Sequence, residues 1–259
     1  MRLPVYIVNA FSQEPFCGNP AAVCPLSEWL DDATMQRIAA QNNLSETAFI
    51  LPDGKGYQIR WFTPAAEVSL CGHATLASAA VVRRFLQPDC QRVDFQSMSG
   101  RLGVEFEQDK ILLDFPVLPA EDVAAPGNLV RGLGVQPAEI LVAEYYMAVL
   151  DSEEQVRELD VNLADFATLD RKGVIVTAPG DEVDFVSRFF APLLSVDEDP
   201  VTGSAHCTLV PYWAQRLGKT RLRARQLSPR GGDLYCELRG GRVQLGGFAN
   251  FYLQGEIEF

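Results

Sequence analysis

The sequence Phe62-Thr63-Pro64, a short linker and Gly72-His73-Ala74-Thr75 return later in the chain as Phe190-Ala191-Pro192, a linker and Gly203-Ser204-Ala205-His206. In both copies the glycine opens a run of mostly apolar residues, and 131 residues separate Gly72 from Gly203. This period is far longer than the roughly 20 to 50 residues of solenoid repeats. The chain of 259 residues is therefore predicted to contain two related halves.

Short alternating segments flank both copies of the motif and match between the halves. Two of them precede each apolar run, split by an Asp-Gly or Pro-Gly turn, and two follow it as a hairpin. Each half is therefore predicted to contain two strands, one helix and two further strands, in that order. The predicted strand pairs are 47–51 with 57–61 and 100–106 with 110–115 in the first half, and 173–177 with 183–186 and 232–238 with 242–245 in the second.

The repeat also predicts a domain boundary near the middle of the chain. We expect residues 1–116 to form an N-terminal domain and residues 117–247 to form a C-terminal domain. Halves built by duplication often exchange a terminal strand. The tail 248–259 is therefore expected to complete the N-terminal domain.

Composition and charge narrow the possible partners. The chain is 47% hydrophobic and 22% charged, with a net charge of −12 and no run of Lys or Arg. This balance is typical of a globular protein and argues against nucleic acid or an anionic membrane as partner. No segment approaches the roughly 20 apolar residues of a membrane span, and no signal-peptide pattern opens the chain, so we predict a cytoplasmic protein.

The cysteines and histidines do not form a metal-binding pattern. The chain has two histidines and no CxxC pair, so incidental or buried thiols are favoured over disulfides or zinc ligands, and no metal site is predicted. The cysteines are Cys17, Cys24, Cys71, Cys90, Cys207 and Cys236.

The two apolar runs predict buried helices whose first turns are suited to an anion. Residues 72–85 and 204–217 are apolar or small on nearly every face before charges appear near their ends. The amino end of a helix presents free N–H groups and the positive end of the dipole. If both ends face one cleft, they would hold a small molecule that carries a carboxylate. Alternatively, Gly72 and Gly203 only permit tight turns into core helices.

Four polar residues near these turns are candidates for chemistry. Glu46 stands where a short helix gives way to an apolar strand, and it is either a general acid/base or a solvated residue. Asp199 lies closest to the second glycine turn, where acids also serve as helix caps. His73 either shuttles a proton or packs in the core. Asn19 is better explained as a turn residue than as a ligand contact, although both interpretations stay open.

Four motifs follow one another in a fixed order: Gly18-Asn19-Pro20-Ala21-Ala22, Asn43-Leu44-Ser45-Glu46-Thr47, Cys71-Gly72-His73-Ala74-Thr75 and Glu198-Asp199-Pro200-Val201-Thr202-Gly203-Ser204-Ala205. With these motifs the chain resembles the PhzF family of phenazine biosynthesis-like isomerases, from Val8 to about Gly255. The resemblance implies the α+β fold of diaminopimelate epimerase. In that fold each of two pseudo-symmetric domains is a mixed, mostly antiparallel sheet curled around a central helix, with the site between the domains.

The resemblance also implies roles for individual residues. Glu46 matches the general acid/base of the family, while His73 and Asp199 match residues that assist proton transfer. The substrate-binding residues implied here are Ser45, Gly72, Gly203 and Ser204, and we add Asn19 as a contact. The implied activity is an isomerase that shifts a proton on a small carboxylate-bearing metabolite without metal or organic cofactor. A homodimer is also plausible from the resemblance.

Two alternatives remain open on the sequence alone. An amino-acid epimerase or racemase on the same fold would use a pair of thiols, and Cys71 is suitably placed beside the first helix start. The matching stretch 199–204 holds no cysteine, which disfavours that reaction, and Cys207 lies about one turn inside the helix. The other alternative is a metabolite-binding protein that lacks turnover.

Overall fold

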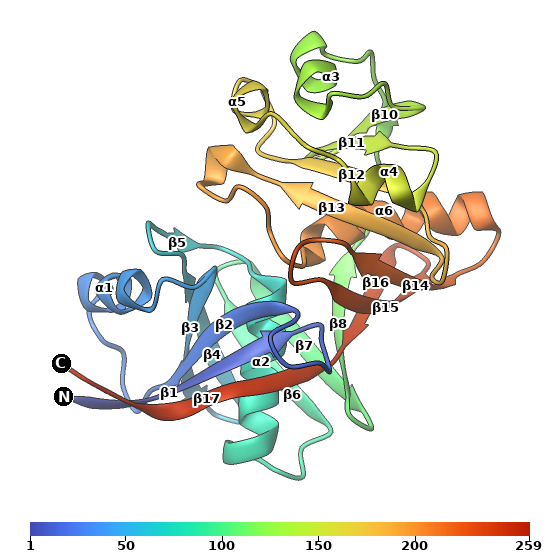
Figure 1. The fold of residues 1–259 in the computed structure, drawn as a ribbon. Coiled ribbons are helices and arrows are strands. Elements are labelled where there is room, and N and C mark those ends of the chain that lie inside the picture. The colour runs from blue at the N-terminus through green and yellow to red at the C-terminus, as the bar shows by residue number, and fades with distance from the viewer. The chain divides into compact units, whose positions relative to one another are not determined.

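The computed structural model describes residues 1–259 and divides into two compact units (Figure 1). Unit 1 comprises residues 1–114 and 246–259, and unit 2 comprises residues 115–245. None of the helices has the length and apolar character that crossing a membrane requires.

Unit 1 is a mixed, mostly antiparallel sheet. Its strands lie in the order β17-β1-β2-β3-β4-β6-β7-β8, and only the pairs β2–β3 and β4–β6 are parallel. The short β5 also pairs with β4. The elements are β1 (Arg2–Ala10), β2 (Asn19–Pro25), α1 (Asp32–Asn42), β3 (Glu46–Asp53), β4 (Gly56–Phe62), β5 (Glu67–Val68), α2 (Gly72–Val81), a π-helical turn (Val82–Leu86), β6 (Arg92–Ser97), β7 (Gly100–Glu107), β8 (Lys110–Pro116) and β17 (Ala249–Glu258).

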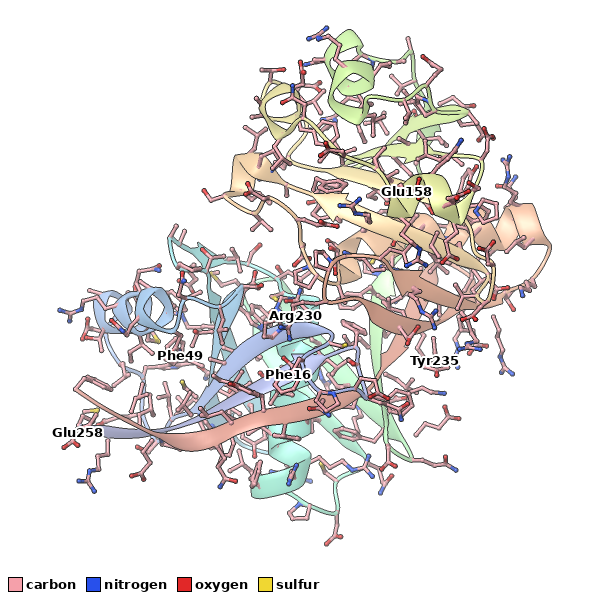
Figure 2. The ribbon with its side chains drawn as sticks, in the orientation of Figure 1. Phe16, Phe49, Glu158, Arg230, Tyr235 and Glu258 are labelled. Atoms are coloured by element: carbon pink, nitrogen blue, oxygen red, sulfur yellow. The ribbon has the colours of Figure 1, made fainter.

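The central helix of unit 1 is α2, which contacts β1, β2, β3 and β17. Every residue from His73 to Val81 is buried, so the helix has no solvent face and the sheet has to curl around it. A second apolar core lies between the sheet and α1, where Phe49 packs with Met35 and Phe62. Phe49 is labelled in Figure 2.

Unit 2 repeats this plan with its own strands. Its sheet runs β9-β10-β11-β12-β13-β14-β15, with β11–β12 and β13–β14 as the parallel pairs. The elements are β9 (Glu121–Asp122), α3 (Gly127–Leu133), β10 (Glu139–Val142), β11 (Tyr146–Val149), α4 (Glu153–Arg157), α5 (Leu163–Phe166), β12 (Val174–Pro179), β13 (Phe185–Phe190), a 3-10 turn (Pro192–Leu194), α6 (Gly203–Leu217), β14 (Arg221–Gln226), β15 (Gly232–Arg239) and β16 (Arg242–Gly247).

The strand pairings of the two units follow the same rule. From β1 to β7 and from β10 to β15, the successive pairs are antiparallel, parallel, antiparallel, parallel and antiparallel. In each unit the central helix connects the two strands of the second parallel pair, as α2 does between β4 and β6 and α6 does between β13 and β14. The strand-strand-helix-strand-strand plan predicted from the repeat is therefore confirmed.

The boundaries of the predicted elements are close to the observed ones, with one clear error. Gly218 ends α6 in the left-handed conformation, at φ 65°, as expected of a C-cap glycine. The strand predicted at 183–186 actually spans Phe185–Phe190. Phe189 and Phe190 extend the strand because both side chains are buried in unit 2.

A buried hydrogen bond ties α6 to the sheet of unit 2. The indole nitrogen of Trp213 donates to the Thr177 hydroxyl at 3.0 Å, and this hydroxyl donates to the Val186 carbonyl at 2.6 Å. The Trp213 ring also stacks on Phe185, with 5.8 Å between centroids. Trp213 and Thr177 are at most 1% exposed, so water cannot replace either partner.

We expect Thr177→Val to lower the free energy of unfolding by about 1–3 kcal/mol, because the indole N–H loses its acceptor without gaining water. Denaturant unfolding followed by tryptophan fluorescence measures this loss. Thr220→Val changes the same atoms at an exposed position and is the control. Equal unfolding midpoints for the two variants would show that the indole hydrogen bond adds nothing.

Candidate active site

Three of the predicted residues meet at the amino end of α2. Glu46 is the first residue of β3, Asn19 is the first residue of β2, and His73 is the second residue of α2. The parallel pairing of β2 with β3 sets Ala21 beside Glu46, and α2 packs against both strands. The sequence separation between the three residues is thus closed by the curling of the sheet around the helix.

His73 lies between a carboxylate and an amide. Its Nε2 is 3.0 Å from Oε2 of Glu46, and its Nδ1 is 3.2 Å from Nδ2 of Asn19. The side chain of His73 is 6% exposed and that of Glu46 is 17% exposed. The Glu46 oxygen nevertheless lies outside good hydrogen-bond geometry with every donor. A carboxylate oxygen held near a proton carrier but not saturated by donors is suited to accept a further proton.

The same cluster contains Cys71, which the predicted set did not include. Cys71 precedes Gly72 as the N-cap of α2, and its side chain makes no capping hydrogen bond. Its sulfur lies 3.5 Å from Nδ1 of His73 and 4.0 Å from Nε2. The sequence signal for including Cys71 in the site is its position directly before Gly72 and His73.

Burial and charge act in opposite directions in this cluster. Burial lowers the pKa of His73, but the neighbouring Cys71 sulfur and Glu46 carboxylate more than offset it, so the pKa lies well above its usual range. Burial raises the pKa of Cys71, and the Glu46 charge raises it further. The combination favours a proton on the imidazole and keeps Cys71 a thiol rather than a thiolate.

Ser45 and Gly72 flank this cluster. Both are half-buried, Ser45 next to Glu46 and Gly72 as the first residue of α2. Since Cys71 provides no side-chain cap, the first N–H groups of α2 are suited to an anion from outside the helix.

The remaining predicted residues, Asp199, Gly203 and Ser204, gather at the amino end of α6 in unit 2. Thr202 donates its hydroxyl to Asp199 Oδ2 at 2.5 Å. The buried Gln226 donates to the Asp199 carbonyl at 2.7 Å and accepts from the Thr202 N–H at 2.9 Å. These bonds fix the turn that precedes Gly203.

Tyr145 is a residue of this group that sequence reasoning missed. Its hydroxyl lies 3.3 Å from the Ser204 hydroxyl, and its ring packs edge-on against Phe189 at 4.8 Å. Burial raises its pKa to about 12, so the phenol keeps its proton and remains a donor. Tyr145 belongs to none of the repeated motifs, and only the fold brings it beside Ser204.

His206 takes no part in such a cluster, although it falls within the second copy of the motif. It is fully buried, and its Nδ1 bonds to the Thr202 carbonyl at 2.8 Å. Burial lowers its pKa to about 4, so this ring is neutral at ordinary pH. Its role is structural.

Glu46, Cys71 and His73 also have the spacing of a cation site, since one ligand atom of each lies within 4.8 Å of the others. The direct contacts fit a different arrangement. The ring meets the carboxylate at Nε2 and lies closest to the sulfur at Nδ1, so the side chains already contact one another without an ion between them.

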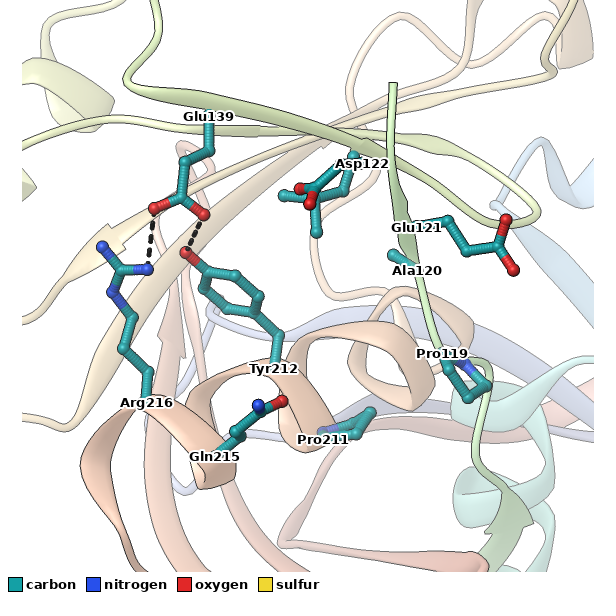
Figure 3. A pocket seen from close by; sticks show the side chains of 10 residues that line it. Pro119, Ala120, Glu121, Asp122, Glu139, Pro211, Tyr212, Gln215 and Arg216 are labelled. Carbon is teal, nitrogen blue, oxygen red and sulfur yellow. Dashed lines mark hydrogen bonds and ion pairs between the residues drawn. The ribbon is translucent and has the colours of Figure 1, made fainter. Parts of the chain in front are cut away.

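A separate cavity of about 700 Å³ lies in unit 2, beside the carboxyl-terminal half of α6 (Figure 3). Glu139 at its wall bonds to Arg216 at 2.7 Å and to Tyr212 at 3.0 Å. None of the predicted site residues lines this cavity. It is therefore distinct from the residue groups described above.

Comparison with known proteins identifies the family. A family model described as phenazine biosynthesis-like protein, PhzC-PhzF, matches residues 8–255. The chain is 50% identical over 258 residues to a Pseudomonas aeruginosa protein named an uncharacterized isomerase, with 99% of both chains covered. It is similar to a crystal structure of a PhzF family protein from Enterococcus faecalis, with a TM-score of 0.98, 46% identity and full coverage of both chains.

The chain belongs to the phenazine biosynthesis-like PhzC-PhzF family. A predicted epimerase from Pseudomonas aeruginosa shares the fold, with a TM-score of 0.76 at 20% identity and coverage of 98% and 99%. These findings confirm the predicted family and α+β fold class, and they support the isomerase class of enzyme.

Glu46→Gln is expected to lower the pKa of His73, because it removes the negative charge beside Nε2. An NMR titration of the two imidazole rings measures this change, with His206 as the internal reference. An unchanged His73 titration would show that the two side chains are not electrostatically coupled.

The two histidines give stability opposite pH dependences. The His73 ring binds its proton more tightly in the folded protein than in the unfolded chain. The protonated ring therefore adds its full share to the free energy of unfolding below the ordinary histidine pKa, and this share is lost as pH rises through the raised pKa of the folded protein. His206 is favoured as the neutral ring, so its contribution is full above the ordinary pKa and is lost as pH falls toward about 4.

Proposed function

We propose that this protein is a cofactor-independent isomerase that shifts a proton on a small carboxylate-bearing metabolite, with Glu46 as the general acid/base. The observation that carries the proposal is the Glu46 oxygen, which lies 3.0 Å from the His73 ring yet lacks a well-aligned donor. Family membership supports the reaction class, because a relative that is 50% identical is named an isomerase.

The proposed chemistry needs only one proton carrier. Glu46 removes a proton from a carbon of the substrate and returns it to another carbon, while the double bond moves between them. No proton is gained or lost overall, and no electron acceptor is required. The positive charge on His73 stabilises the Glu46 carboxylate before the transfer, and the same charge then offsets the negative charge that develops on the substrate.

The helix starts supply the binding groups in this proposal. Gly72 at the start of α2 and Gly203 at the start of α6 each offer backbone N–H groups to a carboxylate, and the Ser45 and Ser204 hydroxyls add donors. Tyr145 donates through its un-ionised phenol. Asp199, held by Thr202 and Gln226, is assigned the assisting role in proton transfer. In this proposal Asn19 contacts the His73 ring rather than the substrate, because its amide nitrogen lies 3.2 Å from Nδ1.

We expect Glu46→Gln to slow turnover by at least about 10²-fold, because the amide cannot accept the proton from carbon. The assay incubates the protein in D₂O with a panel of small carboxylic acids and follows each by proton NMR. Glu158→Gln makes the same change at an exposed position in unit 2 and is the control. Full exchange by the Glu46 variant would remove this residue from the mechanism.

The same assay separates the competing functions. Migration of a double bond is the result expected of the isomerase. Deuterium at the α-carbon of an amino acid, with loss of chirality, would instead identify an epimerase. Saturable binding of a carboxylate without any exchange would identify a binding protein.

Chelation provides a further test of cofactor independence. We expect extensive dialysis against EDTA to leave turnover unchanged, because Glu46 and His73 move and stabilise charge through direct contact. Loss of activity on dialysis, with recovery on addition of a divalent metal, would contradict the proposal and would make Glu46, Cys71 and His73 the ligands to examine.

A further inference from the structure

The Cys71 thiol is the one polar group at the His73 ring that the proposed reaction does not use. It is 7% exposed, and its sulfur contacts Nδ1 of the ring at 3.5 Å. Its position before α2 is that of a capping residue, but its side chain does not cap the helix. The ring of His73 is therefore the side-chain partner that the sulfur contacts.

The contacts at Nδ1 decide which nitrogen faces Glu46. An imidazole ring has two nitrogens, and the partner of one fixes the orientation and protonation of the other. In the neutral ring, the Asn19 amide donates to Nδ1, so the ring proton sits on Nε2, the nitrogen that lies 3.0 Å from Oε2 of Glu46. The Cys71 sulfur lies 3.5 Å from Nδ1 and 4.0 Å from Nε2, and these similar distances place it over the face of the ring rather than in its plane, so it packs against the ring in either protonation state.

We propose that Cys71 is a positioning residue, whose sulfur packs against the face of the His73 ring and keeps Nε2 beside Glu46 in both protonation states of the ring. The consequence for catalysis rests on the proposed role of Glu46 as acid/base, whereas the positioning itself does not. Cys71 is not a nucleophile in this arrangement, because burial and the Glu46 charge keep it a thiol.

The chain offers a matched control for the loss of the thiol. Cys24 lies in β2 of the same unit and is also fully buried, and it packs in the apolar core on the α1 side of the sheet. Cys24→Ala therefore removes the same atoms from a buried site in the same sheet without touching the ring of His73.

The test compares Cys71→Ala, Cys71→Ser and Cys24→Ala by imidazole ¹⁵N–¹H NMR across a pH titration, with no substrate present. We expect Cys71→Ala to change the ring-nitrogen shifts and titration of His73, while Cys71→Ser stays closer to the wild type because its hydroxyl still fills part of the space against the ring. The His206 signals should stay unchanged in all variants, which reports that unit 2 is intact. Cys24→Ala should leave His73 unchanged.

Turnover provides the second measurement. Loss of a residue that orients a functional histidine typically costs about 10 to 100-fold, so we expect Cys71→Ala to lose that much in kcat, with KM little changed and with partial recovery in Cys71→Ser. His73 signals in Cys71→Ala that match both Cys24→Ala and the wild type would overturn the proposal. If Glu46→Gln retains exchange while Cys71→Ala still alters the His73 signals, the proposed function fails and the positioning role of Cys71 survives.

Discussion

The burial of a helix that has no polar face is the constraint from which the rest of unit 1 follows. All of α2 from His73 to Val81 is inaccessible to solvent, so apolar or small side chains must meet it on every side. Strands on one flat face cannot satisfy this requirement, and the sheet closes around the helix instead. The curl carries the first residues of β2 and β3 to the start of α2, where Asn19 and Glu46 meet His73.

The electrostatics of the site depend on this placement. A buried imidazole would ordinarily lose its proton, as His206 does with only a backbone carbonyl as partner. His73 is also buried, but it has the Cys71 sulfur beside Nδ1 and the Glu46 carboxylate beside Nε2, and these neighbours reverse the direction of its pKa shift. Two histidines from corresponding regions of a repeated sequence thus become a charge carrier and a core residue, because only one of them has an acid beside it.

The sequence predicted the plan of the fold better than the details of the site. The repeat of glycine-led apolar runs was sufficient to predict α2, α6 and their flanking strands, because periodicity and turn residues are local signals. Other local features of the sequence pointed to Glu46 and His73 as candidate site residues. The sequence missed Tyr145, because the Tyr145-Tyr146 pair offers no local hint that one hydroxyl meets Ser204 while the other bonds to Asp170 at 2.7 Å. The contact of Cys71 with the His73 ring likewise depends on rotamers and packing, which sequence spacing does not encode. The domain boundaries and the meeting of the two helix starts stay predictions.

The pairing of β17 with β1 has a consequence for biosynthesis. A ribosome delivers β1 long before β17, so the growing chain must keep one edge of β1 uncovered until β17 emerges. Unit 2 is contiguous from residue 115 to residue 245 and has no such dependence on a distant segment. The order of maturation is thus inverted with respect to the order of synthesis: the half that emerges second is the first whose full sequence is available, and the half that carries Glu46 is the last to be completed.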